Sequence, residues 1–234
     1  MNLPLSKRLF VCCGFVCHGD RVADIGCDHG YLGIHLLREG IARSVIAADV
    51  NEMPLQCAIR NAEKYGVRDK MTFYLSNGVS NIPREFDTLV CAGMGADTII
   101  SILDAAIWLR STQYRLILQC QSKTPILRRY LSDNGWRITE ESVLRDGRFL
   151  YTVMEVYWQP QYPRLTVGQW YFPPALLENP GPELPEYYRD VSFRLRRAIH
   201  GQGVNADPIL VEALNELETD PDLIWLKEKH NDNC

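Results

Sequence analysis

Three aspartates and two glycines near the N-terminus have the types and spacing of a ligand site. Asp24, Gly26, Asp28 and Gly30 alternate in a turn that follows a short apolar strand. Because glycine lacks a side chain, a ligand can approach the backbone there, and the amides of the next helix point toward it. A second strand ends in Asp49, where a carboxylate can accept hydrogen bonds from ribose hydroxyls. The pattern predicts a site for a nucleoside cofactor.

The acids in the turn indicate which cofactor it binds. Dinucleotide-binding turns carry G-x-G-x-x-G, which brings the backbone against a pyrophosphate. Here the turn reads Asp24-x-Gly26-x-Asp28-x-Gly30, and Asp28 would repel a pyrophosphate but attract a cation. S-Adenosylmethionine carries a sulfonium, an ammonium and a ribose but no phosphate, so it fits better than NAD. The alternative interpretation is a strand, turn and helix with incidental glycines.

Strand and helix patterns alternate along the first part of the chain. Strands are predicted over 21–26, 44–49, 70–75, 86–91 and 114–119, and helices over 5–17, 31–40, 52–65, 97–109 and 124–134. This alternation is typical of an α/β protein whose parallel sheet is covered on both faces. Two further strands, 137–144 and 149–157, are predicted to join at an Asp146-Gly147 turn.

The composition predicts three parts. Residues 1–158 form the cofactor-binding domain, and residues 159–185 form a linker because seven of the 13 prolines lie there. Residues 186–234 form a small helical hairpin, with helices over 186–201 and 207–229 that are separated at Gly201-Gln-Gly203.

The eight cysteines are scattered, mostly in apolar stretches, which is typical of reduced thiols in a cytoplasmic protein. No apolar run reaches the roughly 18 residues that a membrane helix needs. Lys7-Arg8 before an apolar stretch imitates an export signal, but no cleavage site follows. Cys13, Cys17 and His18 could be metal ligands, but one apolar helix face explains the cysteines. We therefore expect neither membrane insertion nor a metal.

Further ligand contacts are expected where the other strands end, because sites in such sheets lie at the carboxyl ends of the strands. Val50 follows Asp49, Asn77-Gly78 follows the third strand, and Ala92-Gly93-Met94-Gly95 follows the fourth at Cys91. Gln119 and Gln121 end the fifth strand. The alternatives are a simple turn at Asn77-Gly78 and edge polar residues at the two glutamines.

The turn resembles motif I of class I S-adenosylmethionine-dependent methyltransferases, D-x-G-x-G-x-G, with Asp28 in place of the middle glycine. Together with other segments it resembles the bacterial tRNA (adenine-22) methyltransferases over roughly residues 3–180. The segments that carry this resemblance are Leu5–Leu9, Ala23–Leu32, Ala92–Gly95, Leu116–Gln119 and, more weakly, Leu131–Trp136. The resemblance implies a Rossmann-like sheet, mostly parallel with an antiparallel edge strand, and methylation of ring nitrogen 1 of an adenine in tRNA.

The resemblance and the strand-end positions assign roles to individual residues. Asp24 and Asp28 are expected at the amino-acid end of S-adenosylmethionine and Asp49 at its ribose. The other cofactor contacts are predicted at Gly26, Gly30, Val50, Asn77, Gly78, Ala92, Gly93 and Gly95. Asp28, His29 and Met94 are expected to position the substrate, and Arg8, Asp97 and Gln119 to contact it. The alternative interpretation of His29 is a polar residue of the turn, and that of Arg8 is a surface charge.

Several departures from the sequence pattern of that family leave the identity of the substrate undecided. Gly33, Ala96-Asp97 and Cys120 differ from the residues usual in that family, and the tail is short. The net charge of −4 leaves only a local basic patch, Arg189 to His200, for tRNA. A methyltransferase acting on a small molecule or a protein, and a non-catalytic RNA-binding protein with a relict pocket, are the alternatives. The sequence leaves the oligomeric state undetermined.

Overall fold

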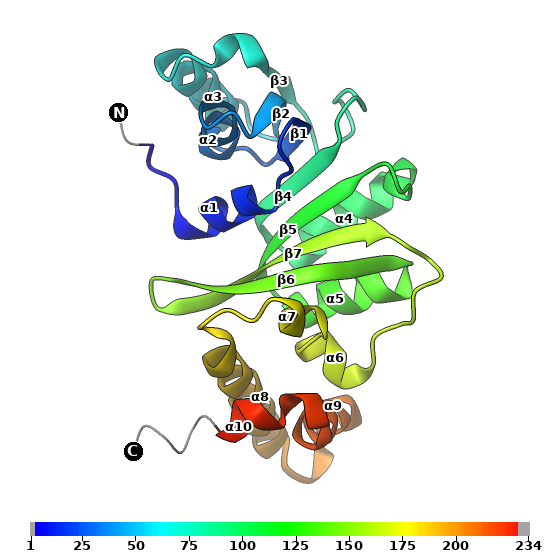
Figure 1. Cartoon of the computed structure of the whole chain (residues 1–234). Helices are drawn as coiled ribbons and strands as arrows, with labels where there is room; N and C mark the ends of the chain where they lie inside the picture. Colours follow the sequence, from blue (N-terminus) through cyan, green and yellow to red (C-terminus); the bar gives the residue numbers. More distant parts are fainter. Residues whose placement is uncertain (1–2, 229–234) are drawn as a thin grey trace.

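A seven-stranded sheet forms the centre of the computed structural model, which describes residues 3–228 (Figure 1). Its order is β3-β2-β1-β4-β5-β7-β6, and β7 runs antiparallel to both of its neighbours. The predicted fold class is therefore confirmed, with the antiparallel strand second from the edge. The strands are β1 (Asp20–Ile25), β2 (Ala42–Asp49), β3 (Met71–Leu75), β4 (Thr88–Gly95), β5 (Arg115–Ser122), β6 (Trp136–Asp146) and β7 (Phe149–Trp158).

The side chains of each strand alternate between two separate apolar cores, one on each face of the sheet. Val90 in β4 packs with Cys12, Ile34 and Ala58 on one face, whereas its neighbour Leu89 packs on the other. The helices of the first face are α1 (Lys7–Gly14), α2 (Tyr31–Arg38) and α3 (Glu52–Lys64), and those of the second are α4 (Ala96–Ala105) and α5 (Thr124–Asp133). The period of two in a strand thus buries both faces, as a parallel sheet requires.

The predicted helices over 5–17 and 97–109 are shorter in the structure. α1 spans only Lys7–Gly14. α4 ends at Ala105, and a 3-10 turn, η2 (Ile107–Leu109), follows it because Trp108 packs edge-on against Phe86. Another 3-10 turn, η1 (Arg68–Lys70), precedes β3.

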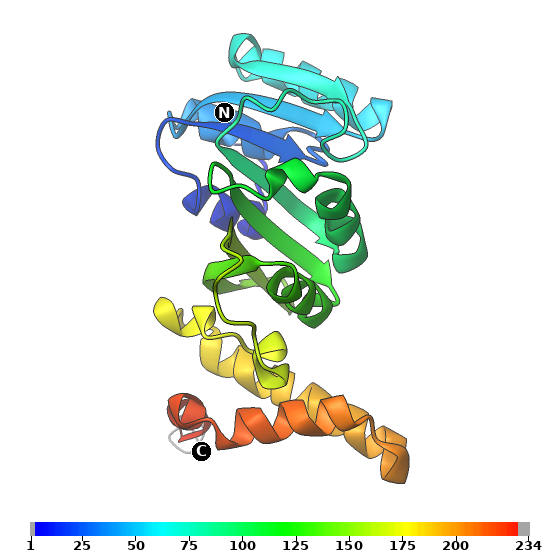
Figure 2. The ribbon, with the colours of Figure 1, turned by 90° about the vertical axis from the view of Figure 1, so that its right-hand side faces the viewer.

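The C-terminal helices lie beyond β6, at the end of the molecule opposite β3 (Figure 2). They share a third apolar core that includes Phe172, Leu184 and Leu217. The elements are α6 (Val167–Tyr171), α7 (Ala175–Glu178), α8 (Leu184–Gln202), η3 (Gly203–Asn205), α9 (Pro208–Thr219), η4 (Pro221–Leu223) and α10 (Ile224–Glu228). α8 packs against α9, as predicted for a hairpin.

Two details differ from the prediction in this region. The segment 159–185 contains α6 and α7, since Thr166 and Gln169 form a capping box that starts α6. The predicted helix over 207–229 ends at Thr219, because Asp220 and Pro221 start a new turn there. Residues 1–2 of the predicted first domain and 229–234 of the predicted hairpin lie outside the described residues.

A buried ion pair joins the sheet to the C-terminal helices. Arg128 in α5 and Glu141 in β6 are both fully buried, 2.6 Å apart. The Arg128 guanidinium also donates to the carbonyl oxygens of Trp170 and Tyr171 and to the Tyr187 hydroxyl. We call these residues the junction. One guanidinium thus binds one residue of the sheet and three of the helices, so it fixes where they sit.

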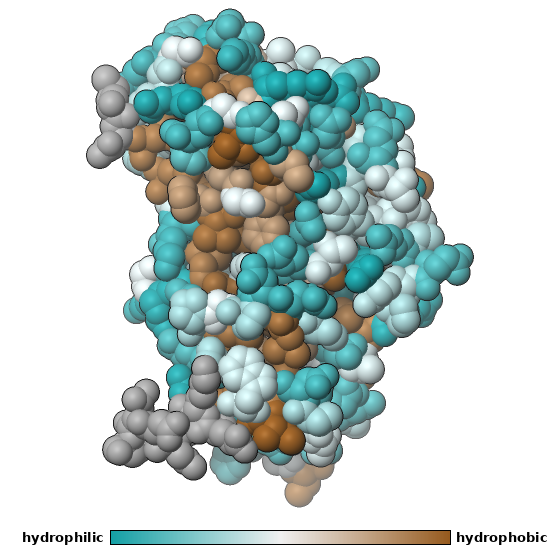
Figure 3. Space-filling model, in the orientation of Figure 1, coloured by the Kyte–Doolittle hydropathy of each residue, from teal (hydrophilic) through white to brown (hydrophobic). Residues whose placement is uncertain are grey.

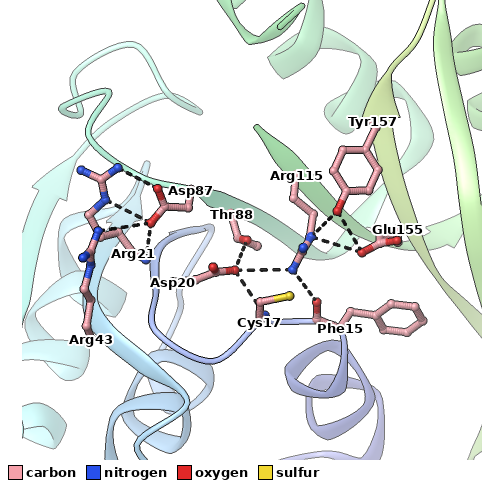
Figure 4. A network of polar contacts seen from close by, with 10 residues as sticks. All are labelled: Phe15, Cys17, Asp20, Arg21, Arg43, Asp87, Thr88, Arg115, Glu155 and Tyr157. Atoms are coloured by element: carbon pink, nitrogen blue, oxygen red, sulfur yellow. Dashed lines mark hydrogen bonds and ion pairs between the residues drawn. The ribbon is translucent and has the colours of Figure 1, made fainter. Parts of the chain in front are cut away.

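The amino ends of the parallel strands are held by a polar network (Figure 4). Arg115, at the start of β5, forms an ion pair with Asp20 at the start of β1 and donates to the Tyr157 hydroxyl. Asp20 also accepts from the Thr88 hydroxyl, and Arg21 pairs with Asp87. Every charge in this network has a partner, which suits a structural role at the edge opposite the predicted site.

The described cysteines are free, and most of them are buried. None of the helices in residues 3–228 has the length and apolar character needed to cross a membrane.

Candidate functional site

Asp24, Asp28 and Asp49 lie at the carboxyl ends of two adjacent parallel strands, and we call them the acidic pocket. β1 and β2 pair in register up to Ile25 and Ala48, which brings Asp24 and Asp49 to the same edge. The Asp49 carboxylate accepts hydrogen bonds from the backbone amides of Asp28 (3.1 Å) and Asn51 (2.9 Å). Two amides therefore fix the Asp49 carboxylate in one orientation, which suits a group that must meet a ligand.

Asp24 is the unbalanced member of this pocket. Its side chain is 4% exposed, and its Oδ2 has no hydrogen-bond partner. Burial, opposed by the Gly33 amide and reinforced by the negative charges of Asp49 and Asp28, raises the Asp24 pKa to about 7. Leaving a buried carboxylate oxygen unpaired costs free energy that a cationic ligand would recover. The pocket is therefore suited to a positive charge, and it would repel a pyrophosphate.

The two glycines of the turn have a backbone conformation and close neighbours that a side chain would disturb. Gly26 and Gly30 have φ angles of 70° and 72°, a conformation that other residues rarely adopt. A Cβ at Gly26 would collide with the Met94 side chain, and one at Gly30 would lie 3.0 Å from Ala58 Cβ. Gly30 also starts α2, whose first amides face the turn. Packing against Met94 and Ala58 thus requires glycine at both positions, and the close approach of a ligand there stays a prediction.

The strand ends beyond Asp49 add an apolar rim. Val50 and Leu75 are exposed at 61% and 52%, unusual for residues of this type beside a polar pocket. Ser76, which the sequence analysis did not single out, is buried, and its hydroxyl donates to the Gly78 carbonyl. Its amide donates to the Asp49 carbonyl, so it ties the turn at Asn77-Gly78 to the pocket. Only the hydrogen bonds of the fold reveal this role.

The segment Ala92–Gly95 is not a loop, contrary to the prediction that the fourth strand ends at Cys91. β4 continues to Gly95 with two register shifts against β5. Gly93 has a φ of 80°, and its amide donates to the Gln119 Oε1 at 3.0 Å. The side chain of Gln119 replaces the regular ladder bond that the bulge removes, so the strand persists.

Gln119 therefore does not meet a substrate in this structure. Its side chain is fully buried, and its amide nitrogen donates to the Cys120 carbonyl. It acts on the shape of the Gly93 bulge, which is a positioning role. Ala92, Met94 and Gly95 lie along the same bulge, and the Met94 side chain reaches over Gly26.

The remaining predicted residues lie around these two centres. His29 is half-exposed, 3.7 Å from the Asp28 carboxylate and 5.7 Å from the Tyr31 ring centroid. Asp97 accepts from the ammonium group of Lys123 at 2.6 Å. Arg8 lies in α1, with its guanidinium carbon 5.9 Å from the centroid of the Tyr151 ring. Figure 3 shows apolar surface gathered around α1 on this side of the molecule.

No cluster of three or more potential metal ligands exists within residues 3–228. Cys13 is buried in the core beneath α1, whereas Cys17 is exposed beyond its end. α1 ends at Gly14, so the single apolar helix face expected to hold both cysteines accounts for Cys13 but is wrong for Cys17.

A family model described as a methyltransferase domain matches residues 5–154. The tRNA (adenine(22)-N(1))-methyltransferase of Bacillus subtilis is 31% identical over 154 residues, which are 65% of this chain and 65% of that protein. The chain thus aligns with just under two thirds of that curated relative. A ribosomal protein L11 methyltransferase of Syntrophomonas wolfei is 32% identical over 141 residues, 58% of this chain and 45% of that protein.

Several solved structures match nearly the whole chain. Sp1610 of Streptococcus pneumoniae, a candidate tRNA (m1A22) methyltransferase, is 30% identical with a TM-score of 0.77 over 96% of this chain and 98% of that one. A second structure of Sp1610, in complex with S-adenosyl-L-methionine, has a TM-score of 0.79. The match includes the C-terminal helices, which the family model does not reach.

Proposed function

This chain belongs to the methyltransferase-domain family, and from that premise we propose that it transfers a methyl group from S-adenosylmethionine to ring nitrogen 1 of an adenine in tRNA. The observation that supports this substrate is the similarity to Sp1610 over 96% of the chain, which includes the C-terminal helices. The ribosomal protein L11 methyltransferases support a protein substrate instead, but they match only 58% of the chain. A tail shared with a candidate tRNA methyltransferase favours RNA.

The residues present fit S-adenosylmethionine. Asp24 offers an unpaired buried carboxylate oxygen, and Asp28 adds a second negative charge at the turn. Both suit the cationic amino-acid end of the cofactor. Asp49, oriented by two amides, suits the ribose hydroxyls, while Val50 and Leu75 offer an apolar surface for the purine.

When bound, S-adenosylmethionine supplies an activated methyl group that a neutral ring nitrogen can accept without prior loss of a proton. The chain therefore has to align the two reactants, a contribution that can reach roughly 7–11 kcal/mol. Gln119 holds the Gly93 bulge, and the Met94 side chain closes over Gly26. These contacts set the floor on which the target base would lie beside the acidic pocket. A base within folded tRNA would have to turn out of its stack to reach it.

The tRNA contact through a local basic patch remains part of the proposal. Arg194 pairs with Asp190 and Arg196 with Glu218, so acids already offset part of the α8 arginines. Binding of an RNA backbone would have to compete with these exposed pairs, which are individually weak.

The test has two measurements on the full chain. Calorimetry with S-adenosylhomocysteine should show binding that Asp49→Ala weakens. Incubation with labelled S-adenosylmethionine and total bacterial tRNA, followed by nuclease digestion and mass spectrometry, should yield 1-methyladenosine. Binding without tRNA labelling would favour a protein or small-molecule substrate, whereas the absence of binding would indicate a relict pocket.

A further inference from the structure

A second cavity lies where the sheet meets the C-terminal helices. Its volume is about 300 Å³. One wall is the turn from β5 into α5, the second is β7, and the third is formed by α8 and α9. Leu150, Val191, Leu195 and Leu210 make much of its floor apolar. The cavity is thus built from both halves of the molecule.

One layer of side chains separates this cavity from the Gly93 bulge. Gln121 and Ser122 line the cavity. On the other side, a Cβ at Gly93 would lie 3.4 Å from the Gln121 amide nitrogen, and one at Gly95 would lie 3.1 Å from the Ser122 hydroxyl. A ligand that occupies both places would have to cross only this layer.

The charge of the cavity is opposite to that of the acidic pocket. Lys123 and Arg194 line it, and none of its lining residues is an aspartate or a glutamate, although Asp97 and Asp190 outside the lining each pair with one of these two cations. Two residues that the sequence analysis assigned to the substrate also contact its wall, because Asp97 pairs with Lys123 and Arg8 lies over the Tyr151 ring. Two cations above an apolar and aromatic floor suit a phosphate attached to a base.

A buried polar group in the wall also lacks a partner. Thr152 in β7 is 2% exposed, and its hydroxyl has no hydrogen-bond partner. Buried hydroxyls are nearly always satisfied, and Thr152 lines the cavity, so a ligand there is one way to satisfy its hydroxyl. A hydroxyl can both donate and accept, so it can meet the edge of a nucleobase.

We propose that this cavity holds the nucleotide next to the methylated adenine in the RNA strand, an inference that rests on the proposed function. Turning the target base out of its stack leaves its neighbour without a stacking partner. The apolar and tyrosine-lined floor takes that neighbour, Thr152 contacts the base edge, and Lys123 and Arg194 face its phosphate. The cavity thereby makes methylation depend on the base beside the target.

The first experiment fills the cavity from its exposed side. Ala198 is an exposed residue of α8 that lines the cavity, so Ala198→Trp places an indole there without disturbing the core. Asn215→Trp, at an exposed position of α9 outside both the lining and the basic patch, is the matched control. We expect kcat/KM for total tRNA to fall about tenfold or more in Ala198→Trp, with S-adenosylhomocysteine affinity and Tm unchanged. Equal activity in the two variants would overturn the subsite.

The second experiment removes the orphan hydroxyl. Thr152→Val should raise Tm, because an unsatisfied buried group disappears, while kcat/KM for tRNA falls about three- to tenfold. Thr152→Ser should keep the activity. A tRNA that lacks the base on one side of the methylated adenine should be methylated more slowly than intact tRNA by the wild type. Ala198→Trp should methylate this tRNA and intact tRNA at the same reduced rate. If the base deletion and Ala198→Trp reduce the rate additively, whichever neighbouring base is deleted, the subsite is overturned. A wild type that methylates no tRNA would overturn the proposed function as well.

Discussion

The acidic pocket and the junction both bury a carboxylate, and they treat it in opposite ways. Glu141 at the junction receives two hydrogen bonds from the Arg128 guanidinium, and both side chains are fully buried. Asp24 in the acidic pocket is buried nearly as completely but has an unpaired oxygen and two acidic neighbours. The satisfied carboxylate of Glu141 fixes architecture, whereas the unsatisfied oxygen of Asp24 is the one that the proposed cofactor would meet. Four predictions test this contrast.

The largest effect is expected at the junction. Arg128→Met leaves the Glu141 carboxylate buried without a counter-charge, which should lower the free energy of unfolding by about 3–5 kcal/mol. Arg129→Met is the matched control, because its guanidinium forms an exposed pair with Asp133 and should cost less than about 1 kcal/mol. Urea denaturation measures both. The double variant Arg128→Met with Glu141→Leu should recover most of the loss, and a failure to do so would mean that other contacts of Arg128 dominate.

In the acidic pocket, removing the buried charge should raise stability instead of lowering it, and the gain should depend on pH. The Asp24 pKa is raised to about 7 in the folded protein, against an ordinary value of 3.8. Between these values the unfolded chain is ionised while folded Asp24 holds its proton, so this group lowers stability as pH rises and its cost is complete above pH 7. Asp24→Asn should therefore gain stability relative to the wild type from pH 4 to pH 7, by up to about 4 kcal/mol. A pH-independent difference would contradict the assignment.

The oriented carboxylate of Asp49 should matter for binding. Asp49→Ala removes an acceptor that two amides position for the ribose, which should weaken S-adenosylhomocysteine binding by roughly 1.5–3 kcal/mol. Asp69→Ala removes an exposed acid from η1 and serves as the control for charge alone. Calorimetry decides between them. If both variants bind equally well, Asp49 does not meet the ribose.

The smallest effect concerns the pH dependence of cofactor affinity. Because ionised Asp24 attracts a cation and protonated Asp24 does not, affinity for S-adenosylmethionine should rise about tenfold between pH 6 and pH 8, following a pKa of about 7. Asp24→Asn should abolish this rise and should bind more weakly than the wild type already at pH 6, because the ionised fraction of Asp24 carries the wild-type affinity there. An identical pH profile in the variant would assign the titration to another group.

The acidic pocket was accessible from the sequence because its members are close in the chain or end successive strands. The positions of Asp24, Gly26, Gly30 and Asp49 follow from one turn and one parallel pairing. The continuation of β4 through Gly93 was not predictable, since it depends on a hydrogen bond from Gln119, far along the chain. Asp220-Pro221 is a sequence pattern that predicts the end of α9. The prediction was missed because the apolar periodicity continues on both sides of it.

Local sequence alone determined the α/β alternation, the turn of the acidic pocket and the final strand hairpin, because each depends on residues within one or two elements. Only the tertiary structure decided how the C-terminal helices sit, which charges are paired and where the second cavity lies. Arg128, Glu141 and Tyr187 come from three separate segments, and the Lys123 and Thr152 that line the cavity come from two. Pairing and cavities depend on distances in space, and a sequence records only distances along the chain.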